Sequence, residues 1–396
     1  MIRSIYDYNF ENKLTLVRVD FNVPLDENLN VSDDTRIVES LTTINKIIDD
    51  GGIPVLMSHL GRPKGTVNLK YSLKPVAKYL QDRFGYDVLF ANDCIGTETE
   101  RIVKSAVPGQ IVLLENLRFH QGEEENSVEF AQQLRKFGEA YVNDAFGTCH
   151  RAHASIDALP RLFEDRFSGA LLVKEIDYLG RAVNNPLKPY VVIIGGAKIV
   201  GKIDIIQNLS TKCDYILIGG GLAYTFLKAK GLSIGNSIYE EDKLSLAKQL
   251  LDDPVVGKKI ILPIDVIVAD KMDNSATIEN RSVEDIPNGW MGVDIGFQTR
   301  ERFSRIILES RMVVWNGPVG VFEIDKFSEG TRSISFTLVE ATGRGVTTIV
   351  GGGDSASAIS KLGLKDKVSH VSTGGGASLE FLSGKALPGV LALEKS

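Results

Sequence analysis

The stretch GGAKIVGKI, residues 195–203, places lysines in a glycine-rich turn directly after the apolar run VVII. Gly196, Gly201 and Lys202 match the spacing of a phosphate-binding P-loop, G-x-x-x-x-G-K. The next position of that motif needs a serine or threonine hydroxyl for magnesium, and Ile203 stands there instead. The stretch is therefore either an ordinary glycine-rich turn or a phosphate site of another geometry.

Basic side chains follow several predicted strands in the first half of the chain, in RVDFNVP, HLGRP, ENLRF and NDAFGTCHRAH. Because the carboxyl ends of parallel strands meet at one edge of an open sheet, we expect these side chains to converge. Arginine suits phosphate and carboxylate because its planar guanidinium donates two parallel charge-assisted hydrogen bonds. The sequence predicts a site for a small polyanion, formed by Arg36, His59, Arg62, Arg118, His150 and Arg151.

A zinc site is the alternative for part of this region, since Cys149, His150 and His153 carry the usual zinc ligands. Arg151 lies between the two histidines, and its charge opposes a bound cation. We therefore favour anion binding there. Two further histidines, His120 and His370, are interpreted as hydrogen-bonded structural groups.

Glycines and a few acids replace the arginines in the second half. GGAKIVGK, IGGGLAY, GWMGVDIG, WNGPVGVFE, VGGGDSAS and STGGGASLE place flexible backbone after predicted strands. Backbone N–H groups approach phosphate closely where no Cβ intervenes, and a helix N-terminus adds positive potential. If IVGKID begins a helix, Lys198 and Lys202 lie on one face, and their repulsion favours an anion over them.

The loop VGGGDSA also fits a dinucleotide fingerprint, G-x-G-x-x-A, through Gly351, Gly353 and Ala356. Asp354 would then point a carboxylate at the pyrophosphate, and no acid stands about 20 positions further on to hold a ribose. An acid among phosphate-binding glycines is explained if magnesium lies between them. The loop therefore predicts a magnesium contact at Asp354.

Strands and helices that could position these loops alternate along the whole chain. Apolar runs such as LTLVRV, IPVLMS, YVVII, KIILPIDVIV and MVVW indicate strands buried on both faces, and the intervening helices indicate parallel crossovers. Ser32 is predicted to cap the first helix and Gly51 to close it, and GEEENS (122–127) to be a solvated helix start. The predicted fold class is α/β, with two doubly wound, Rossmann-like parallel-sheet domains joined by a helical hinge.

The expected domain boundary lies where the helical pattern ALLVKEIDYLGRAV runs into Pro186 and Pro189. We predict a first domain over residues 1–170, a connecting helix and hinge over 171–186, and a second domain over 187–379. The length of 396 residues agrees with two domains.

Composition excludes several function classes. A hydrophobic content of 43% with 24% charged residues is typical of a globular protein, and a net charge of −6 argues against nucleic-acid binding. Cys94, Cys149 and Cys213 are scattered and MIRSIYDYNF is no leader, so we expect a reducing cytoplasm. The apolar runs are too short to cross a bilayer.

In order along the chain, RVDFNVP, DDTRI, HLGRP, ENLRF, NDAFGTCHRAH, GGAKIVGKI, WNGPVGVFE, GGGDSA and STGGGASLE resemble the motifs of the phosphoglycerate kinase family. The resemblance implies reversible phosphoryl transfer from 1,3-bisphosphoglycerate to MgADP in glycolysis, giving 3-phosphoglycerate and MgATP by direct in-line transfer after hinge closure. It implies a monomeric, cytoplasmic enzyme that uses Mg²⁺ and has no nucleic-acid or membrane partner. The tail, about residues 380–396, would pack back on the first domain.

The resemblance also implies the roles of individual residues. Arg36, Lys202 and Gly375 would be catalytic, Glu323 would hold the ribose, and Asp354 would contact magnesium. The triose phosphate would bind Asp20, Phe21, Asn22, Arg36, His59, Leu60, Gly61, Arg62, Arg118 and Arg151. The nucleotide would bind Lys198, Lys202, Gly292, Glu323, Gly352, Gly353, Asp354 and Ser355, and the transferred phosphate would meet the amides of Gly374, Gly375 and Gly376.

Two other classes of function are open from the residues alone. An NAD-dependent oxidoreductase has a similar architecture, but the missing ribose acid disfavours it. A non-enzymatic, hinge-bending binding protein for small anions does not explain why a basic site and a glycine-rich site occur in different halves.

Overall fold

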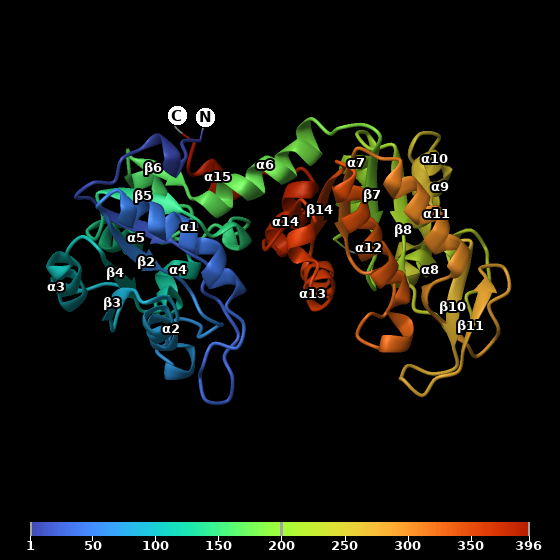
Figure 1. The fold of residues 1–396 in the computed structure, drawn as a ribbon, viewed down its shortest axis with the longest axis horizontal. Helices are drawn as coiled ribbons and strands as arrows, with labels where there is room; N and C mark the ends of the chain where they lie inside the picture. The colour runs from blue at the N-terminus through green and yellow to red at the C-terminus, as the bar shows by residue number, and fades with distance from the viewer. Residues whose placement is uncertain (1, 199–200, 395–396) are drawn as a thin grey trace. The chain divides into compact units, whose positions relative to one another are not determined.

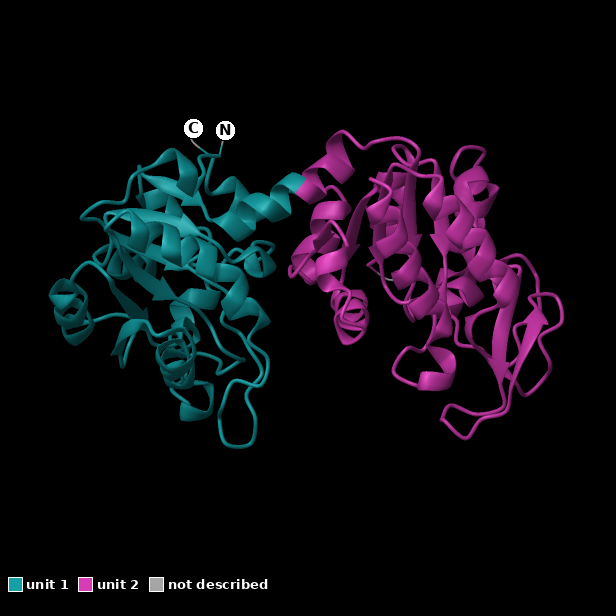
Figure 2. Ribbon diagram, viewed as in Figure 1, with its two compact units in different colours: residues 1–177, 386–396 teal, residues 178–385 magenta. Residues whose placement is uncertain are grey.

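The computed structural model describes residues 2–198 and 201–394, and helices alternate with strands along the chain (Figure 1). The chain divides into two compact units (Figure 2): unit 1 comprises residues 1–177 and 386–396, and unit 2 comprises residues 178–385. Each unit contains a parallel sheet of six strands joined through helices, so the predicted α/β fold class is confirmed. The hinge over residues 171–186 stays a prediction.

Unit 1 is built on a parallel sheet with the strand order β3-β4-β2-β1-β5-β6. Every residue of the central strand β2 is buried, which is typical of a strand covered by helices on both faces. The strands are β1 (Leu14–Arg18), β2 (Ile53–Met57), β3 (Asp87–Ala91), β4 (Gln110–Leu114), β5 (Ala140–Asn143) and β6 (Arg166–Ser168). The helices are η1 (Ile5–Asp7), α1 (Thr35–Asp49), η2 (Leu69–Tyr71), α2 (Lys74–Phe84), α3 (Thr97–Ser105), η3 (Leu117–Phe119), α4 (Gln121–Glu124), α5 (Val128–Arg135), η4 (Phe146–Thr148), η5 (Pro160–Leu162) and α15 (Pro388–Leu391).

Helix α1 leads away from β1 and begins later than predicted. Its N-cap is Asp34, and Ser32 instead donates its hydroxyl to Pro24 O at 3.1 Å, so the prediction of Ser32 as the cap is wrong. The backbone turn at Pro24 thus competes for the hydroxyl that would have capped the helix. The predicted end is confirmed, because Gly51 follows the helix with φ of 80°, a conformation that favours glycine.

Unit 2 contains a parallel sheet with the order β15-β14-β13-β7-β8-β9 and a second, antiparallel sheet with the order β11-β10-β12. The strands are β7 (Tyr190–Ile194), β8 (Tyr215–Ile218), β9 (Ile260–Ile261), β10 (Asp265–Ala269), β11 (Ile278–Ser282), β12 (Met291–Ile295), β13 (Met312–Asn316), β14 (Thr347–Gly351) and β15 (His370–Val371). The helices are α7 (Ile203–Ser210), α8 (Gly220–Ala229), η6 (Glu241–Lys243), α9 (Leu244–Asp252), α10 (Val256–Lys259), α11 (Phe297–Leu308), η7 (Asp325–Phe327), α12 (Glu329–Gly343), α13 (Gly353–Lys361), η8 (Lys365–Lys367) and α14 (Gly376–Leu382).

The run KIILPIDVIV, predicted as one strand, is divided between the two sheets of unit 2. Its first part is the short edge strand β9, and its second part is β10, the central strand of the antiparallel sheet. Pro263 lies between them and has no N–H to donate to a ladder, so one continuous strand cannot pass through it. The prediction of purely parallel sheets is therefore incomplete.

Helix α6 (Ala170–Asn184) starts in unit 1 and ends in unit 2. Its first turn is fixed by Asp144, whose Oδ1 accepts the N–H groups of Leu171 at 2.9 Å and Leu172 at 3.3 Å. Ala170 donates its N–H to Thr43 Oγ1 at 2.8 Å. These side chains satisfy N–H groups that a helix leaves unpaired at its beginning.

The last residues of the chain belong to unit 1 although the preceding ones belong to unit 2. Gly389, in α15, donates its N–H to Cys149 O at 2.9 Å and accepts from Asn143 Nδ2 at 3.3 Å. Arg166 donates to Glu394 O at 2.5 Å, so the tail is also tied to β6. Among the described helices, none is long and apolar enough to cross a membrane.

Candidate active site

The loop after β1 lies at the centre of a basic site at the carboxyl ends of the unit 1 strands. Asn22 Oδ1 accepts the N–H of Gly61 at 2.9 Å, and Asn22 O accepts from Arg36 Nη1 at 3.1 Å. Asp20 Oδ2 lies 3.0 Å from the same nitrogen. Phe21, between them, is fully buried and anchors the loop in the core. The loops that follow β1 and β2 are thereby tied to the first turn of α1, as the strand-end argument predicts.

His59 is buried and electrically neutral. Burial, reinforced by the charges of Arg18 and neighbouring arginines, holds the pKa of His59 well below its usual value. Its Nδ1 lies 3.2 Å from Arg18 Nη2, which can only donate, so the imidazole proton is on Nε2. Arg18 Nε donates to Ser155 Oγ at 2.9 Å, and Ser155 Oγ donates to Glu123 Oε1 at 2.6 Å. The interpretation of residues 122–127 as a solvated helix start is therefore wrong at Glu123, which is fully buried.

Arg118 offers unused hydrogen-bond donors to the site. Its Nη1 donates to Gly61 O at 2.9 Å, and its Nε lies 3.4 Å from Glu124 Oε1 without hydrogen-bond geometry. Among the described residues, Nε and Nη2 find no hydrogen-bond partner although both are buried. Burial lowers the pKa of Arg118. Buried donors of a charged group are costly when unpaired, so this guanidinium is suited to an anion.

The ENLRF segment owes its shape to two buried polar residues that sequence reasoning did not single out. Asn116 Nδ2 donates to Leu60 O at 2.7 Å and Asn116 Oδ1 accepts the N–H of Arg118 at 3.0 Å. Glu115 Oε1 accepts the N–H groups of Leu73 at 2.8 Å and of Asn116 at 2.7 Å. These bonds position the backbone of the HLGRP loop beside Arg118.

The remaining basic residues of the site differ in environment. Arg62 is exposed, and Arg151 is half-buried with its Nε 3.2 Å from His150 Nε2. His153 lies near these basic residues. Burial and then the charges of Arg118, Arg18 and Arg151 lower the pKa of His153 to about 4. Cys149 is buried and hydrogen-bonds Asn143 Nδ2 at 3.5 Å, and burial raises its pKa to about 12.

Unit 2 contains a cavity of about 410 Å³ at the ends of its strands. Of the predicted nucleotide residues, Gly292, Glu323 and Asp354 line it. Gly292 must be a glycine, because a Cβ there would collide with the Tyr224 hydroxyl. The wall is mostly apolar, and among its residues are Ile238, Pro263, Met272, Met291, Val293 and Val321.

Lys202 lies over glycine backbone close to this cavity. Its Nζ donates to Gly195 O, and a Cβ on Gly196 or on Gly317 would collide with Nζ. Burial lowers the pKa of Lys202 to about 8, and the charge of Asp354 opposes this shift. Gly196 and Gly317 thus leave the space that the Lys202 ammonium group occupies, and Gly195 accepts its hydrogen bond.

The expectation that Lys198 and Lys202 lie on one helical face is wrong. Helix α7 begins at Ile203 with Lys202 as its N-cap, and Lys198 is exposed ahead of the helix. Residues 199 and 200 of GGAKIVGKI lie outside the described residues. Ile203, the first residue of α7, stands where the P-loop motif needs a serine or threonine hydroxyl.

The loop GGGDS forms the start of helix α13. Gly352, with φ of 84°, is the N-cap, and Asp354 is exposed in the first turn. Ser355 is buried, and its hydroxyl accepts the N–H of Gly317 at 2.6 Å. The Ser355 side chain therefore supports the Gly317 turn, while its backbone N–H lies among the first N–H groups of the helix.

The second glycine loop precedes α14. Gly375 is the N-cap with φ of 51°, and Gly374 donates its N–H to Ser372 Oγ at 3.2 Å. One of the three amides predicted to meet phosphate, that of Gly374, therefore already has a partner. Gly376 begins the helix.

Two buried polar residues of unit 2 were missed. Asn316, at the end of β13, accepts the N–H of Gly195 through its backbone O at 2.9 Å, and its buried Nδ2 has no hydrogen-bond partner among the described residues. A Cβ on Gly352 would lie 3.1 Å from that Nδ2. Asp294 accepts the N–H of Gly330 at 2.5 Å, and burial raises its pKa to about 7. The available signal was a polar residue near the end of an apolar run, Asn316 after Trp315 and Asp294 after Val293.

Together the two units define a class of protein: a two-domain α/β protein with a basic site at the strand ends of one unit and a largely apolar cavity, lined in part by glycines, in the other. The family model for phosphoglycerate kinase matches residues 5–385. A phosphoglycerate kinase from Chlorobium phaeobacteroides (strain DSM 266) is 52% identical over 392 residues, which cover 99% of each chain.

Solved structures agree with this match. The structure of phosphoglycerate kinase from Coxiella burnetii has a TM-score of 0.90 at 38% identity and covers 99% of both chains. That from Pyrococcus horikoshii has a TM-score of 0.84 at 29% identity, covering 99% of this chain and 98% of the other. The chain therefore belongs to the phosphoglycerate kinase family.

Proposed function

We propose that the protein transfers a phosphoryl group reversibly from 1,3-bisphosphoglycerate to MgADP, giving 3-phosphoglycerate and MgATP in glycolysis. The observation that carries the proposal is a pair of cations in different units. Arg118 in unit 1 is buried and Lys202 in unit 2 is partly buried, and neither hydrogen-bonds a carboxylate among the described residues, although Arg118 Nε lies 3.4 Å from Glu124 Oε1. Each is therefore suited to an anionic ligand of its own.

In this proposal the triose phosphate binds the basic site of unit 1. Asp20 and Asn22 meet the glycerate end, the backbone at Leu60 and Gly61 frames it, and His59 donates from Nε2. The guanidinium groups hold the anionic ends, since each can form two parallel bonds to carboxylate or phosphate. These groups are Arg36, Arg62, Arg118 and Arg151.

The nucleotide occupies the cavity of unit 2, with its base against the apolar wall and its ribose at Glu323. Its phosphates lie at the N-terminus of α13 and at Lys202, where backbone N–H groups and a cation meet. Asp354 fits a magnesium ion, because one exposed carboxylate beside substrate phosphates is a common Mg²⁺ environment. Magnesium, when bound, would neutralise phosphate charge there.

Transfer is direct: the bond between the ADP β-phosphate oxygen and phosphorus forms as the acyl oxygen–phosphorus bond breaks, and 3-phosphoglycerate leaves as a carboxylate. Arg36, Lys202 and the amide of Gly375 stabilise the negative charge on the phosphoryl group during its transfer. Arg36 and Lys202 lie in different units. The units therefore close about α6, which brings the reactants in line and excludes water.

The enzyme would act as a cytoplasmic monomer without a nucleic-acid or membrane partner. Its domains would follow the predicted bounds of 1–170 and 187–379, with the tail attached to the first. The net charge of −6 supports the absence of a nucleic-acid partner.

A coupled assay with 3-phosphoglycerate and MgATP tests the function through Arg36→Ala and Lys202→Ala. Each removes charge-assisted bonds worth about 1.5–3 kcal/mol, so the rate should fall roughly 10- to 100-fold or more. Matched controls are Arg101→Ala and Lys104→Ala, which remove the same charges from exposed ion pairs on α3 and should keep the wild-type rate. A wild-type rate in either site variant would remove that residue from the mechanism, and no transfer by the wild-type protein would overturn the function.

A further inference from the structure

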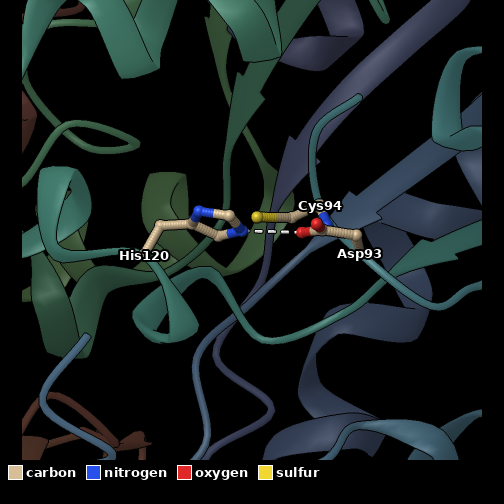
Figure 3. A group of neighbouring side chains, drawn as sticks. All are labelled: Asp93, Cys94 and His120. Carbon is tan, nitrogen blue, oxygen red and sulfur yellow. Dashed lines mark hydrogen bonds and ion pairs between the residues drawn. The ribbon is translucent and has the colours of Figure 1, made fainter. Parts of the chain in front are cut away.

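Asp93, Cys94 and His120 form a compact group of metal-ligating side chains, and none of them has a part in the proposed reaction (Figure 3). The three ligand atoms, a carboxylate oxygen, Sγ and an imidazole nitrogen, all lie within 4.8 Å of one another. His120 Nε2 and Asp93 Oδ1 are 2.6 Å apart. Figure 3 shows Cys94 Sγ beside the line that joins these two atoms.

The fold brings these side chains together at neighbouring strand ends. Asp93 and Cys94 follow β3, His120 follows β4 and η3, and β3 and β4 are adjacent parallel strands. The His120 ring is stacked on Phe130 with centroids 5.4 Å apart, and Asp93 O accepts the Thr99 hydroxyl at 3.0 Å. The His120 ring and the Asp93 backbone are therefore held in place.

We propose that Asp93, Cys94 and His120 bind a zinc ion or a similar borderline divalent cation. One thiolate, one imidazole and one carboxylate are all zinc ligands, and bonds of about 2.0–2.3 Å require ligand atoms somewhat more than 3 Å apart. Opening the His120–Asp93 contact by under about 1 Å makes room for the ion. Binding replaces the thiol proton of Cys94, which passes to solvent, and leaves the imidazole proton on Nδ1.

The surroundings support a cation with one open coordination position. Glu115 and Glu123 add negative charge around Cys94, and their carboxylates accept hydrogen bonds from Ser72, Leu73 and Ser155. Cys94 is buried, whereas the Asp93 side chain is 52% exposed, so solvent can supply the fourth ligand on the Asp93 side. The thiolate disfavours Mg²⁺, which prefers oxygen ligands.

The bound ion would join two loops that lead to the basic site. His120 lies two residues after Arg118 and three residues before Glu123, which holds Ser155. A metal at His120 thus fixes this segment to the loop after β3. Its role would be to reinforce the connection that the His120–Asp93 contact already makes between the two loops.

Cobalt(II) absorption spectroscopy on the metal-free full-length chain tests the site, because a thiolate ligand produces an intense charge-transfer band. We expect one Co²⁺ per chain, displaced by Zn²⁺ but not by excess Mg²⁺. Cys94→Ser should abolish the band, and Asp93→Asn and His120→Gln should weaken Co²⁺ binding by more than about tenfold. Cys213→Ser removes another buried cysteine, in unit 2, and should leave the titration unchanged.

Thermal unfolding gives a second readout that does not depend on the thiolate band. Zn²⁺ should raise the Tm of the wild-type chain and of Cys213→Ser but not of Asp93→Asn. The proposal is overturned if the wild-type chain shows no thiolate band, or if folded Cys94→Ser keeps it. Should Cys94→Ser fail to fold, equal Co²⁺ affinity in wild type and Asp93→Asn would overturn it instead. The test is independent of the kinase activity, which is measured with Mg²⁺.

Discussion

At the scale of single residues, Lys202 links the electrostatics of the unit 2 site to a measurable proton. Burial lowers its pKa to about 8, so near pH 8 about half of the ligand-free molecules carry a neutral amine. Phosphate groups beside the amine favour the ammonium form and raise the pKa again. MgADP binding near pH 8 should therefore take up about half a proton per nucleotide, and far less at pH 6.5.

Titration calorimetry in buffers of different ionisation enthalpy measures this uptake. Lys202→Met should abolish it, and Lys230→Met, at an exposed lysine elsewhere in unit 2, should keep it. The lowered pKa of Lys202 also has a separate effect on the free energy of unfolding. Because the unfolded chain holds this proton up to the ordinary lysine pKa, the cost of burying the ammonium is present below pH 8 and is relieved as pH rises above it. Equal proton uptake in wild type and Lys202→Met would show that another group titrates.

At the scale of elements, two buried carboxyl groups hold the beginnings of helices. Asp144 accepts N–H groups at the start of α6, and Asp294 accepts one at Gly330 near the start of α12. Burial raises the pKa of each from 3.8 to about 7. The folded chain therefore holds these protons longer than the unfolded chain does, and stability is lost as pH rises from about 4 to about 7.

Asp144→Asn and Asp294→Asn should each remove part of this loss. A shift of about three pKa units corresponds to at most on the order of 4 kcal/mol, so between pH 5 and 7.5 each variant should lose less stability than wild type. The chain has two tryptophans, Trp290 and Trp315, and both lie in unit 2. Tryptophan fluorescence should therefore report the effect of Asp294→Asn, and calorimetry the effect of both. The same pH slope in all three proteins would contradict the buried-carboxyl account.

Local patterns predicted much of this architecture, because apolar runs and turn residues act within a few positions of the chain. Most strands of both six-stranded sheets and the closure of α1 at Gly51 are of this kind, whereas the short strands β6 and β15 were not predicted. Pro263 carried a local signal as well, since a residue without an N–H cannot continue a ladder. The strand pattern also predicts that the basic side chains lie together, because they directly follow parallel strands, which end at one edge of the sheet.

Contacts between distant segments could not be predicted in this way. Arg18 and Ser155 are 137 positions apart, yet they connect Glu123 to His59. The acidic run around Glu123 has the composition of a surface segment, and only this partner explains its burial. The Ser355 hydroxyl likewise bonds Gly317, 38 positions away. Such contacts depend on which segments the fold places side by side. The composition of a segment indicates only the average environment of its residues.

At the scale of the whole molecule, the proposed reaction requires ligands held by different units to meet. Helix α6 is the described element that passes from one unit to the other before the tail returns. Either ligand alone contacts only the unit that binds it. When both are bound, each ligand can also contact the opposite unit after closure. Because a ligand shifts a conformational equilibrium only through differential binding, closure should need both.

Small-angle X-ray scattering on the full chain tests this with 3-phosphoglycerate and MgADP, a pair that binds without reacting. The radius of gyration should fall when both are present and change little with either alone. Gly180→Ala serves as the matched hinge variant, since a Cβ there meets nothing within 4 Å and should stabilise α6 by roughly 0.5–1 kcal/mol. If α6 bends during closure, this variant should bind each ligand normally but compact less. Full compaction with a single ligand, or none with both, would contradict closure as the step that joins the two half-sites.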